Sequence, residues 1–442
     1  MCKTPILTAI EEYISQNNLR LHTPGHAGEN LLNFKGFEQI LSYDITEIRG
    51  LESLFESRGA IRQSETWAAK IIGANSVVYS ASGSTPLIQA ALSVARLGGR
   101  KVVFLGPVHK SAINACILLD IMPVFADFGD VEALLKQDDV GAVFVTNPTY
   151  CGEIFAVDDI VKSCKTRGIP LIVDSAHGAH LQFFSRNVNQ KGESVDTPAV
   201  IINSAHKTLP ALTGGAWAQI FDERFSPEIF KEHMAIFAST SPSYPILLSL
   251  ELCLNWLNYN GANILKSLTN RALEFKKNLV NMGFFEISDD PLRATISAKN
   301  FGITGFNLQN FLREYKIYAE MADFDYVILL LHPNLTAENF KKLEFVFCEI
   351  SQKYKNEKIG EKSENFKQFH DFFAPKMVTS PREAHFANRE KITVESALNR
   401  TAAQICGPTP PGIPLTVPGS KICKKTQNLL KNYGILEVLV VK

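Results

Sequence analysis

Short apolar runs alternate with segments of helical periodicity from about residue 76 to residue 220. The runs are rich in β-branched residues, are apolar throughout, and cover residues 77–79, 102–105, 142–145, 171–173 and 200–202. Strands that are apolar on both faces are typical of a parallel sheet covered by helices on both sides. The pattern therefore predicts an α/β region built on a mostly parallel sheet.

The pattern changes after about residue 240. Helical periodicity dominates there, with intermittent strands such as the apolar run at residues 327–331, and this mixture predicts a smaller α+β domain. Residues 351–374 are rich in Lys, Glu, Asn and Ser, which indicates an exposed helix or a linker. A last segment from about 375 to 442 contains a proline-rich stretch at 407–414. A chain of 442 residues is long enough for two or three such units.

Charge and composition exclude several classes of protein. The 45 basic and 45 acidic residues cancel to a formal charge of +0, so no global field attracts nucleic acid or a membrane surface. No apolar run reaches the roughly 18 residues that span a bilayer, and the first residues lack the form of a secretory signal. The eight cysteines are scattered without a C-x-x-C pair, which indicates reduced thiols. We expect a cytoplasmic protein.

Polar side chains follow each of the predicted strands. Open α/β sheets bind their ligands beyond the carboxyl ends of the strands, so these positions matter most for function. They include hydroxyls, three histidines, one carboxylate and two lysines, and they lie at residues 80–85, 106–110, 146–150, 174–177 and 203–207. Their convergence predicts a binding site at this edge of the sheet.

The first of these stretches contains Gly83, Ser84 and Thr85, which precede a helical pattern at residues 87–95. At the N-terminus of that helix, free backbone N–H groups and two hydroxyls would face an anion, so the stretch predicts a phosphate site. The alternative is an ordinary Ser or Thr N-cap, which is commoner in general.

Asp174 directly follows the fourth predicted strand. A carboxylate at that position could keep a pyridine ring nitrogen protonated and so make the ring an electron sink. The alternatives are a helix N-cap and a structural ion pair. The spacing of Asp174, His177 and His180 also suggests metal ligands on one helical face, but no Glu base and no matching ligand set accompany them. We therefore predict no metal.

Lys207 lies just beyond the fifth predicted strand, next to His206. Partial desolvation there would lower the pKa of its amine, which is the condition under which lysine forms Schiff bases. A lone lysine after a strand is usually solvated, but Asp174 stands one strand earlier, and Ser204 and His206 could hold a phosphate. His109 follows the second strand, where an imidazole could lie flat against a cofactor ring and deliver a proton, or be hydrogen-bonded in a loop.

Taken in order, these motifs resemble the Orn/Lys/Arg decarboxylases. They include LHTPGH at 21–26, GST at 83–85, HKS at 109–111, DSAHGAH at 174–180, SAHKTLP at 204–210 and PPGIP at 410–414. Each motif is weak alone, whereas the ordered set over nearly the whole chain is specific. The resemblance implies a pyridoxal-phosphate (PLP) enzyme of the aspartate-aminotransferase-like fold type I, in the short form without an N-terminal wing domain.

The resemblance assigns roles to the candidate residues. Lys207 would hold PLP in Schiff-base linkage, Asp174 would pair with the pyridinium nitrogen, and His109 would stack on the ring. His177 would lie near the phenolic oxygen of the cofactor. The phosphate would be held by Gly83, Ser84, Thr85, Ser204 and His206.

The resemblance also implies a division of the chain and an assembly. The division has an N-terminal arm, a large PLP-binding domain, a small α+β domain, a charged linker or helix and a C-terminal decarboxylase-family domain, at residues 1–65, 66–238, 239–350, 351–374 and 375–442. The assembly would be a homodimer, or a larger assembly of dimers, with active sites at the subunit interface. The LHTPGH stretch of the arm would contribute there.

The implied reaction is decarboxylation of lysine, ornithine or arginine to a polyamine-type amine and carbon dioxide. The substrate amine would displace Lys207, PLP would absorb the electron pair, and His109 or Lys207 would return a proton. The sequence leaves the choice of substrate open. Thr409 stands where the family often has Tyr and Ser420 where it often has Glu, and Glu383 is one candidate for binding the substrate head group.

Two other interpretations stay open. A different PLP reaction on the same fold, such as transamination or C–S lysis, would also use Asp174 and Lys207, and a matched arginine for the substrate α-carboxylate would favour transamination. A non-catalytic relative that serves as a binding or regulatory subunit is the second, and the retained Lys207 speaks against it.

Overall fold

The computed structural model describes residues 4–31, 33, 35–183, 197–354 and 375–442. The charged stretch predicted at 351–374 lies outside these residues except for its first four positions, which end helix α13 (Ala337–Tyr354). Within the described residues, no helix combines the length and the apolar character needed to cross a membrane.

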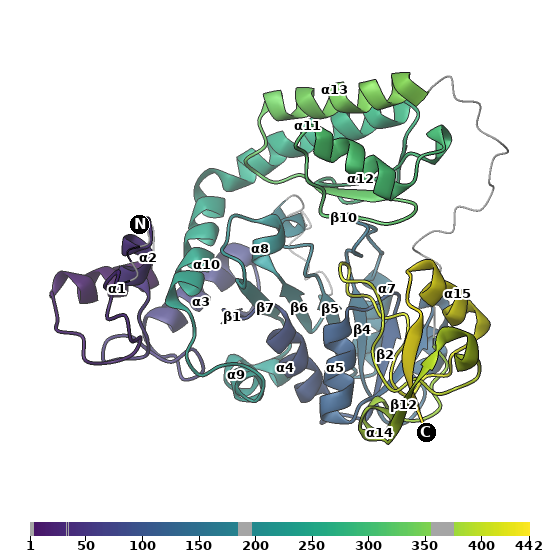
Figure 1. Ribbon diagram of the computed structural model, residues 1–442. Helices are drawn as coiled ribbons and strands as arrows, with labels where there is room; N and C mark the ends of the chain where they lie inside the picture. Colours follow the sequence, from purple (N-terminus) through teal and green to yellow (C-terminus); the bar gives the residue numbers. More distant parts are fainter. Residues whose placement is uncertain (1–3, 32, 34, 184–196, 355–374) are drawn as a thin grey trace.

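A seven-stranded sheet forms the centre of the chain (Figure 1), and its strand order is β1-β7-β6-β5-β4-β2-β3. Strand β7 runs antiparallel to both of its neighbours, whereas β2, β3, β4, β5 and β6 pair in parallel. In chain order the strands are β1 (Ser76–Ser80), β2 (Lys101–Leu105), β3 (Met122–Ala126), β4 (Val140–Thr146), β5 (Leu171–Asp174), β6 (Val200–Asn203) and β7 (Ala216–Ile220). This mostly parallel α/β sheet confirms the predicted fold class.

The five predicted apolar runs form β1, β2, β4, β5 and β6, and two further strands were not predicted. Strand β3 contains Pro123 and lies at the edge of the sheet, where a missing backbone donor is tolerated. Strand β7 contains Gln219, whose side-chain amide donates to Asn203 Oδ1 at 2.6 Å. Because this buried polar residue interrupts the run, β7 lacks the apolar pattern that marks the other strands.

The strands place alternate side chains in two separate cores, as the two-residue period of a strand requires. Phe104 and Phe144 pack on the face that is covered by α4 (Thr85–Ala95), α5 (Lys110–Leu119) and α9 (Pro227–Ala235). Val103 and Val143 pack on the opposite face with α7 (Asp158–Thr166). Both faces are therefore dry, which explains why these strands are apolar at every position.

A second sheet of four antiparallel strands lies above the central sheet in Figure 1. Its order is β10-β11-β9-β8, from β8 (Phe285–Glu286), β9 (Arg293–Ser297), β10 (Met321–Ala322) and β11 (Val327–Leu330). Helices α11 (Ala262–Asn281), α12 (Gly305–Glu314) and α13 accompany it. Helix α10 (Tyr244–Trp256) runs through a π-helical turn (Leu257–Gly261) directly into α11 and so joins the two sheets. Strand β11 confirms the strand predicted at 327–331.

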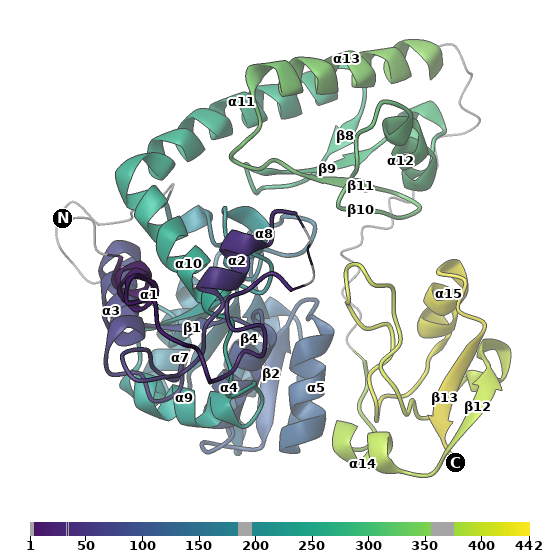
Figure 2. The same ribbon diagram turned by 60° about the vertical axis from the view of Figure 1, so that its left-hand side comes forward.

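The N-terminal and C-terminal segments pack on the central part of the chain from different sides (Figure 2). Helix α1 (Pro5–Ser15) is anchored by Glu251, whose carboxylate accepts the backbone N–H groups of Ile6 and Leu7 at 3.1 and 3.0 Å. In the C-terminal segment, Arg382 of α14 (Pro381–Phe386) donates to the carbonyl oxygen of Leu118 at the end of α5 at 3.0 Å.

The remaining regular elements are short or lie in these terminal segments. They are α2 (Glu38–Tyr43), α3 (Ala60–Ile72), α6 (Val131–Leu134), α8 (Ala205–Thr208), α15 (Lys424–Asn432) and the antiparallel pair β12 (Arg389–Thr393) and β13 (Glu437–Val441). The division of the chain into domains at the predicted boundaries stays a prediction.

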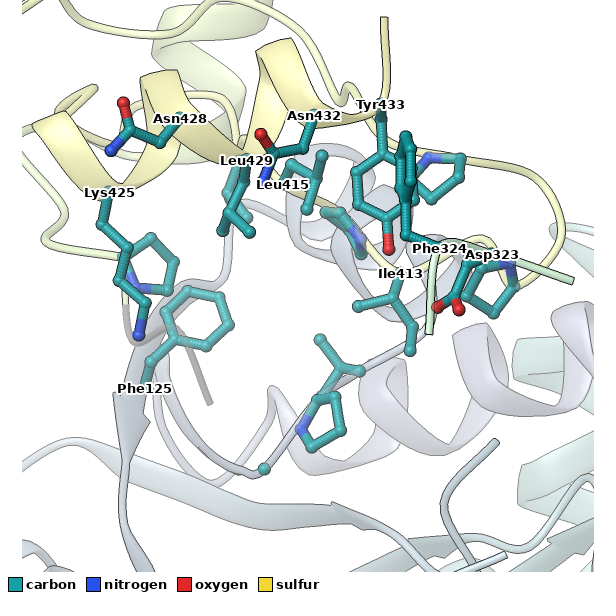
Figure 3. Close-up of a pocket in the computed structure, with 18 of the residues that line it drawn as sticks. Phe125, Asp323, Phe324, Ile413, Leu415, Lys425, Asn428, Leu429, Asn432 and Tyr433 are labelled. Atoms are coloured by element: carbon teal, nitrogen blue, oxygen red, sulfur yellow. The ribbon is translucent and has the colours of Figure 1, made fainter. Parts of the chain in front are cut away.

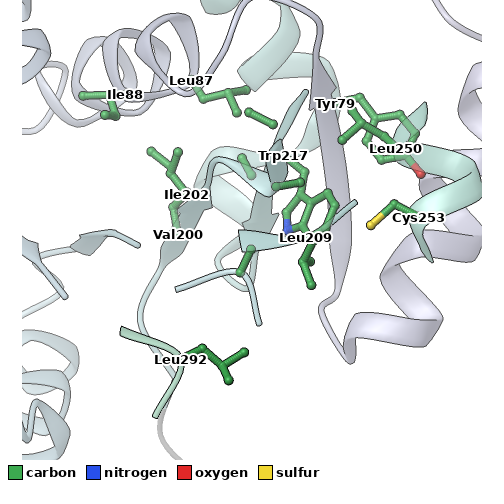
Figure 4. Packing of buried hydrophobic residues seen from close by; sticks show 14 of the residues in the cluster. Tyr79, Leu87, Ile88, Val200, Ile202, Leu209, Trp217, Leu250, Cys253 and Leu292 are labelled. Carbon is green, nitrogen blue, oxygen red and sulfur yellow. The ribbon is translucent and has the colours of Figure 1, made fainter. Parts of the chain in front are cut away.

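Trp217 of β7 provides a test of the core. Its side chain is 0% exposed, packs among Tyr79, Leu209 and Leu250 (Figure 4), and donates from Nε1 to Asn203 Oδ1 at 3.1 Å. We expect Trp217→Ala to lower the free energy of unfolding by about 3–5 kcal/mol, because it leaves a large cavity and removes one of the two hydrogen bonds that Asn203 Oδ1 accepts.

Chemical denaturation of the purified protein measures this effect. The control is Leu97→Ala, because the Leu97 side chain is 77% exposed and its loss should change the free energy by less than about 0.5 kcal/mol. Equal denaturation midpoints for the two variants would contradict the central place of Trp217 in the core.

Candidate active site

A cavity of about 280 Å³ lies beyond the carboxyl ends of the parallel strands. All nine residues predicted for the site line it, namely Gly83, Ser84, Thr85, His109, Asp174, His177, Ser204, His206 and Lys207. The cavity is also lined by Thr146, Tyr150 and Ala176, by Pro107 after β2, and by Pro411 and Ile413 of the C-terminal segment. The structure therefore brings the predicted residues together, from the ends of β1, β2, β5 and β6, around one space.

Asp174 ends β5 with a side chain that is 2% exposed. Its Oδ1 accepts the backbone N–H of Ala176 at 3.1 Å, which closes a tight turn after the strand. Burial raises the pKa of this carboxyl group, and the charge of Lys207 and the Ala176 N–H act against that rise. A buried carboxylate in this position favours a cationic group in the cavity, as a protonated pyridine nitrogen would be.

Lys207 extends from the short helix α8 into the same cavity. Its Nζ lies 3.1 Å from Nε2 of His177. Burial lowers the pKa of the Lys207 amine, Asp174 raises it in part, and the charge of Arg293 lowers it further. The lysine is therefore not an ordinary solvated side chain, because its surroundings favour the neutral amine that a Schiff base requires.

His177 and His180 both contact the segment that leads into β9. Nδ1 of His177 lies 2.6 Å from Nη2 of Arg293, and Nε2 of His180 lies 2.8 Å from Oδ1 of Asp290. His180 is therefore turned away from Asp174, toward the second sheet. The three-residue spacing that suggested metal ligands is accounted for by these contacts, and the described residues contain no group of three His, Cys, Asp or Glu side chains that could hold a metal.

The predicted phosphate site consists of the starts of α4 and α8. Ser84 and Ser204 are the N-cap residues of these helices, and among the described residues neither side chain makes a capping hydrogen bond. Both hydroxyls are therefore available to an anion in the cavity. The N–H of Gly83 is not among the free donors of this stretch, because it donates to the carbonyl oxygen of Gly214 at 2.7 Å. Gly83 contributes a left-handed turn instead, with φ of 75°.

His206 stands beside this site and is oriented by the backbone. Its Nδ1 donates to the carbonyl oxygen of Gly215 at 2.9 Å, so Nε2 is the ring nitrogen left for a ligand. Burial lowers the pKa of the His206 imidazole and the contact with Gly215 partly opposes this.

His109 forms the wall nearest the C-terminal segment. It is the N-cap of α5, and its Nδ1 accepts the backbone N–H of Ser111 at 3.2 Å. The loop that carries Pro411 and Ile413 approaches the other ring nitrogen so closely that a Cβ on Gly412 would lie 2.7 Å from His109 Nε2. Gly412 also has φ of 76°, so glycine is required here for two reasons.

Figure 3 shows a second, larger cavity of about 680 Å³, which we call the outer cavity. It adjoins the first cavity, because both are lined by Pro107, Pro411 and Ile413. Tyr433, which directly follows α15, lines one side, and the turn between β10 and β11 brings Asp323 and Asp325 to it. The carboxylate of Asp325 forms an ion pair with Lys299 at 2.6 Å. Burial raises the pKa of Asp323 to about 6. The outer cavity is thus mainly apolar with two acids at one side.

Three residues named from the sequence do not line either cavity. Glu383 caps α14, where its carboxylate accepts the N–H of Ser380, so it is not placed to bind a substrate head group. Ser420 is buried and donates to the carbonyl oxygen of Val417 at 2.6 Å, and Thr409 accepts from Lys110 Nζ at 3.3 Å.

Two other residues near the site were given no individual role from the sequence, although Tyr150 lies in the polar stretch at 146–150. Tyr150 lines the cavity and donates to Glu320 Oε1 at 2.8 Å, and Arg293 reaches His177 from behind. One signal could have found Arg293. Asp290 and Arg293 are three residues apart along the chain, as His177 and His180 are. This shared spacing lets the two segments meet at two contacts, His177 with Arg293 and His180 with Asp290.

Comparison with known families agrees with this geometry. The family description "Orn/Lys/Arg decarboxylase, major domain" matches residues 4–133 and 129–292, and "Orn/Lys/Arg decarboxylase, C-terminal domain" matches residues 362–438. The chain belongs to the Orn/Lys/Arg decarboxylase family.

Individual relatives and structural neighbours are distant from the chain in sequence but cover it well. It is 26% identical to the arginine decarboxylase of Bacillus subtilis (strain 168), over 96% of this chain and 92% of that protein. The crystal structure of the Francisella novicida lysine decarboxylase LdcF covers 100% of this chain and 81% of its own, with a TM-score of 0.81 and 17% identity. The serine palmitoyltransferase of Sphingomonas wittichii covers 80% of this chain and 84% of its own, with a TM-score of 0.55 and 12% identity, which shows the same fold.

The position of His109 generates a pH prediction. Burial, and then the charges of Lys207 and Lys110, lower the pKa of His109 to about 4. We expect its ring to stay neutral from pH 8 down to about pH 5 in the protein without cofactor. Because an unfolded chain protonates His109 near the usual pKa of about 6.5, this group destabilises the folded state as the pH falls from there toward 4.

The proton NMR signals of the histidine rings, assigned through His109→Gln, give the titration directly. The same variant should weaken the loss of stability between pH 6.5 and 4 relative to the unchanged protein. A midpoint near 6.5 for His109 would mean that the cavity is wetter or less positively charged than its geometry indicates.

Proposed function

We propose that this member of the Orn/Lys/Arg decarboxylase family uses PLP to decarboxylate a basic amino acid. The observation that carries the proposal is the meeting of Lys207 and Asp174 in one cavity at the strand ends, with hydroxyls at two helix N-termini beside them. A lysine amine, a buried carboxylate and an anion site are the three features that PLP needs from its protein. The family supplies the reaction class.

Each residue of the cavity would have its own role in binding the cofactor or in catalysis. Lys207 would attach the cofactor, Asp174 would keep its ring nitrogen protonated, and Ser84 and Ser204 would bind its phosphate with the other residues of the two helix starts. When bound, PLP supplies an electron sink for the pair released with carbon dioxide. His109 would lie against the ring, and as a neutral imidazole it could hold or move a proton at the carbon that loses the carboxylate.

Arginine is the substrate that we place first, ahead of lysine and ornithine. The B. subtilis relative, which is similar to this chain over nearly its full length, is named an arginine decarboxylase. The outer cavity supports a long cationic side chain, because its apolar residues suit a methylene chain and the carboxyl group of Asp323 suits a positive end. The product would be the corresponding polyamine-type amine, and a role in polyamine metabolism and a cytoplasmic location remain predictions.

The geometry disfavours transamination as the alternative reaction. A transaminase on this fold needs an arginine that can take the substrate α-carboxylate. Among the described residues no arginine lines the cavity, and Arg293 behind it donates to the carbonyl oxygens of Thr149 and Tyr150 and to His177 instead.

We also propose that the chain acts as a homodimer or an assembly of dimers. Large apolar side chains are exposed on the N-terminal arm, where Leu19, Leu21 and Leu31 are 84%, 86% and 78% exposed and Phe37 and Ile40 are also exposed. An apolar surface of this kind favours contact with another protein surface, and the arm is where the family resemblance predicts a subunit interface.

The cofactor and the reaction can be tested together. We expect the purified protein to bind PLP with a visible absorbance band and to release carbon dioxide from one of arginine, lysine and ornithine. Lys207→Ala should abolish the band and lower carbon dioxide release by at least about a thousandfold, because covalent attachment and proton transfer both depend on this amine.

Glu383→Gln is the matched control, since Glu383 caps α14 outside both cavities and its loss should leave turnover unchanged. A band without carbon dioxide release from any of the three would replace decarboxylation by another PLP reaction. The absence of a band at any PLP concentration would exclude a PLP enzyme.

The assembly prediction is tested by light scattering. The unchanged chain of 49.0 kDa should scatter as a dimer or a multiple of it, and Leu19→Asp with Leu21→Asp should shift the mass to that of one chain. Leu97→Asp changes an equally exposed leucine outside the arm and should leave the mass unchanged. A single-chain mass for the unchanged protein at micromolar concentration would contradict the dimer.

A further inference from the structure

We propose that Arg293 is a positioning residue that fixes the single proton of His177 on Nε2 and thereby holds Lys207 as a neutral amine. Arg293 belongs to β9 of the second sheet and does not line the cavity, but it contacts His177, which does. The inference rests on the proposed function, because a neutral Lys207 matters only if the lysine attaches a carbonyl compound.

The donors of Arg293 determine which nitrogen of His177 carries the hydrogen. A guanidinium group has five N–H donors and no acceptor, and it stays protonated in proteins. Nη2 of Arg293 lies 2.6 Å from Nδ1 of His177, so Nδ1 must accept and carry no hydrogen. A neutral imidazole has one hydrogen, which therefore resides on Nε2.

The contact between His177 and Lys207 determines whether the lysine donates or accepts. Nε2 of His177 lies 3.1 Å from Nζ of Lys207. With a hydrogen on Nε2, His177 is the donor and Lys207 must offer a lone pair, which an ammonium group lacks. A protonated Lys207 would leave both ring nitrogens as acceptors, which requires an imidazolate. The three side chains therefore form one directed series of hydrogen bonds, from Arg293 through His177 to Lys207.

Arg293 is held in place independently of His177. Its side chain is 1% exposed, and Nη1 donates to the carbonyl oxygens of Thr149, at 3.1 Å, and of Tyr150. The Tyr150 ring lies 5.8 Å from the guanidinium carbon, within cation–π range. A guanidinium with two backbone carbonyls as partners cannot turn away from His177 without losing them, so the direction of the series is fixed by the fold.

The charges around His177 agree with this assignment. Burial, and then the charges of Arg293 and Lys207, hold the pKa of His177 well below its usual value, with smaller contributions from His109 and His180. Asp174 and, more weakly, Glu320 act in the opposite direction on the Lys207 amine. His177 is therefore neutral near pH 7. Asp174 favours the charged form of Lys207, whereas the charge of Arg293 favours its neutral form.

A second contact between the same two segments provides the matched control. His180 and Asp290 lie three residues from His177 and Arg293 along their segments, are both buried, and meet at 2.8 Å. Neither residue lines the cavity. Loss of this pair should weaken the attachment of the second sheet without changing the proton on His177.

A neutral Lys207 has a defined use in the proposed function. The lone pair of Nζ forms the bond to the aldehyde carbon of PLP, and the aldehyde oxygen leaves as water with the two hydrogens of the amine. Attachment of the cofactor is therefore faster the larger the neutral fraction of Lys207. The Nε2 hydrogen of His177 would then no longer be needed by the amine and would be available to another acceptor in the cavity.

The first measurement needs no variant of Arg293. Long-range proton–nitrogen NMR of the protein without cofactor distinguishes the two neutral tautomers of a histidine, and the signals of His177 are identified by their loss in His177→Asn. We expect a neutral ring with its hydrogen on Nε2 at pH 7. A hydrogen on Nδ1, or a doubly protonated ring, would overturn the proposal.

The second measurement follows the rate at which the absorbance band of attached PLP appears, as a function of pH. Arg293→Met removes the charge and the donor, so the pKa of Lys207 should rise and the rate at pH 7 should fall about tenfold. Arg293→Lys keeps both features and should restore most of the rate. Asp290→Asn should lower the melting temperature while leaving the pH profile of attachment in place.

The outcomes separate this inference from the proposed function. If the unchanged protein attaches no PLP, the proposed function fails, and the NMR measurement still decides where the proton of His177 lies. If it attaches PLP with the same pH profile in Arg293→Met, or if Asp290→Asn shifts the profile as much as Arg293→Met does, Arg293 is merely structural.

Discussion

The pairing register of β5 with its two parallel neighbours is the constraint on which the candidate site depends. Asp174 lies opposite Thr146 of β4 and Ile202 of β6, so the three strands end at the same level. A slip of one residue would turn Asp174 to the other face of the sheet. The register is enforced by the cores, because Ile172 must face α4 while Val173 faces α7, and each such buried side chain contributes about 1.5–3 kcal/mol. Apolar packing thus fixes the position of a carboxylate.

Once fixed, the charged residues of the cavity constrain one another. Burial raises the pKa of Asp174 and lowers the pKa of Lys207, so each group favours its neutral form, while the attraction between them favours the charged pair. In a space with little water, small changes in geometry decide between these states. This balance is typical of sites whose groups must exchange protons near neutral pH. His109 and His177 add to it as neutral rings whose hydrogen bonds, not their charges, set their orientation.

Much of this arrangement could be predicted from the sequence, because local patterns carry it. Five strands and their polar ends are marked by apolar runs, and the nine candidate residues follow those runs directly. Strand β7 was not predicted because the polar residue Gln219 interrupts its apolar run. Glu383 was named as a candidate for binding the substrate because the sequence alone does not distinguish a carboxylate that caps a helix from one that binds a ligand. The role of each candidate residue stays a prediction. The contacts that the sequence could not predict join segments far apart in the chain, such as Arg293 and His177, which are separated by 116 positions. Their meeting depends on the turn of α10 into α11, which sets the second sheet over the first.

The approach of Gly412 to His109 has a consequence for the order of events during synthesis. The walls of the cavity run from Gly83 to Ile413, so a growing chain completes the sheet long before it can close the cavity. A small molecule held by both parts would stabilise the docked C-terminal loop by the same free energy with which the loop retains the molecule. The fraction of chains that contain the cofactor would then indicate the fraction that has finished folding. A shortage of the cofactor would make the C-terminal loop accessible to proteases before it lowered the stability of the sheet.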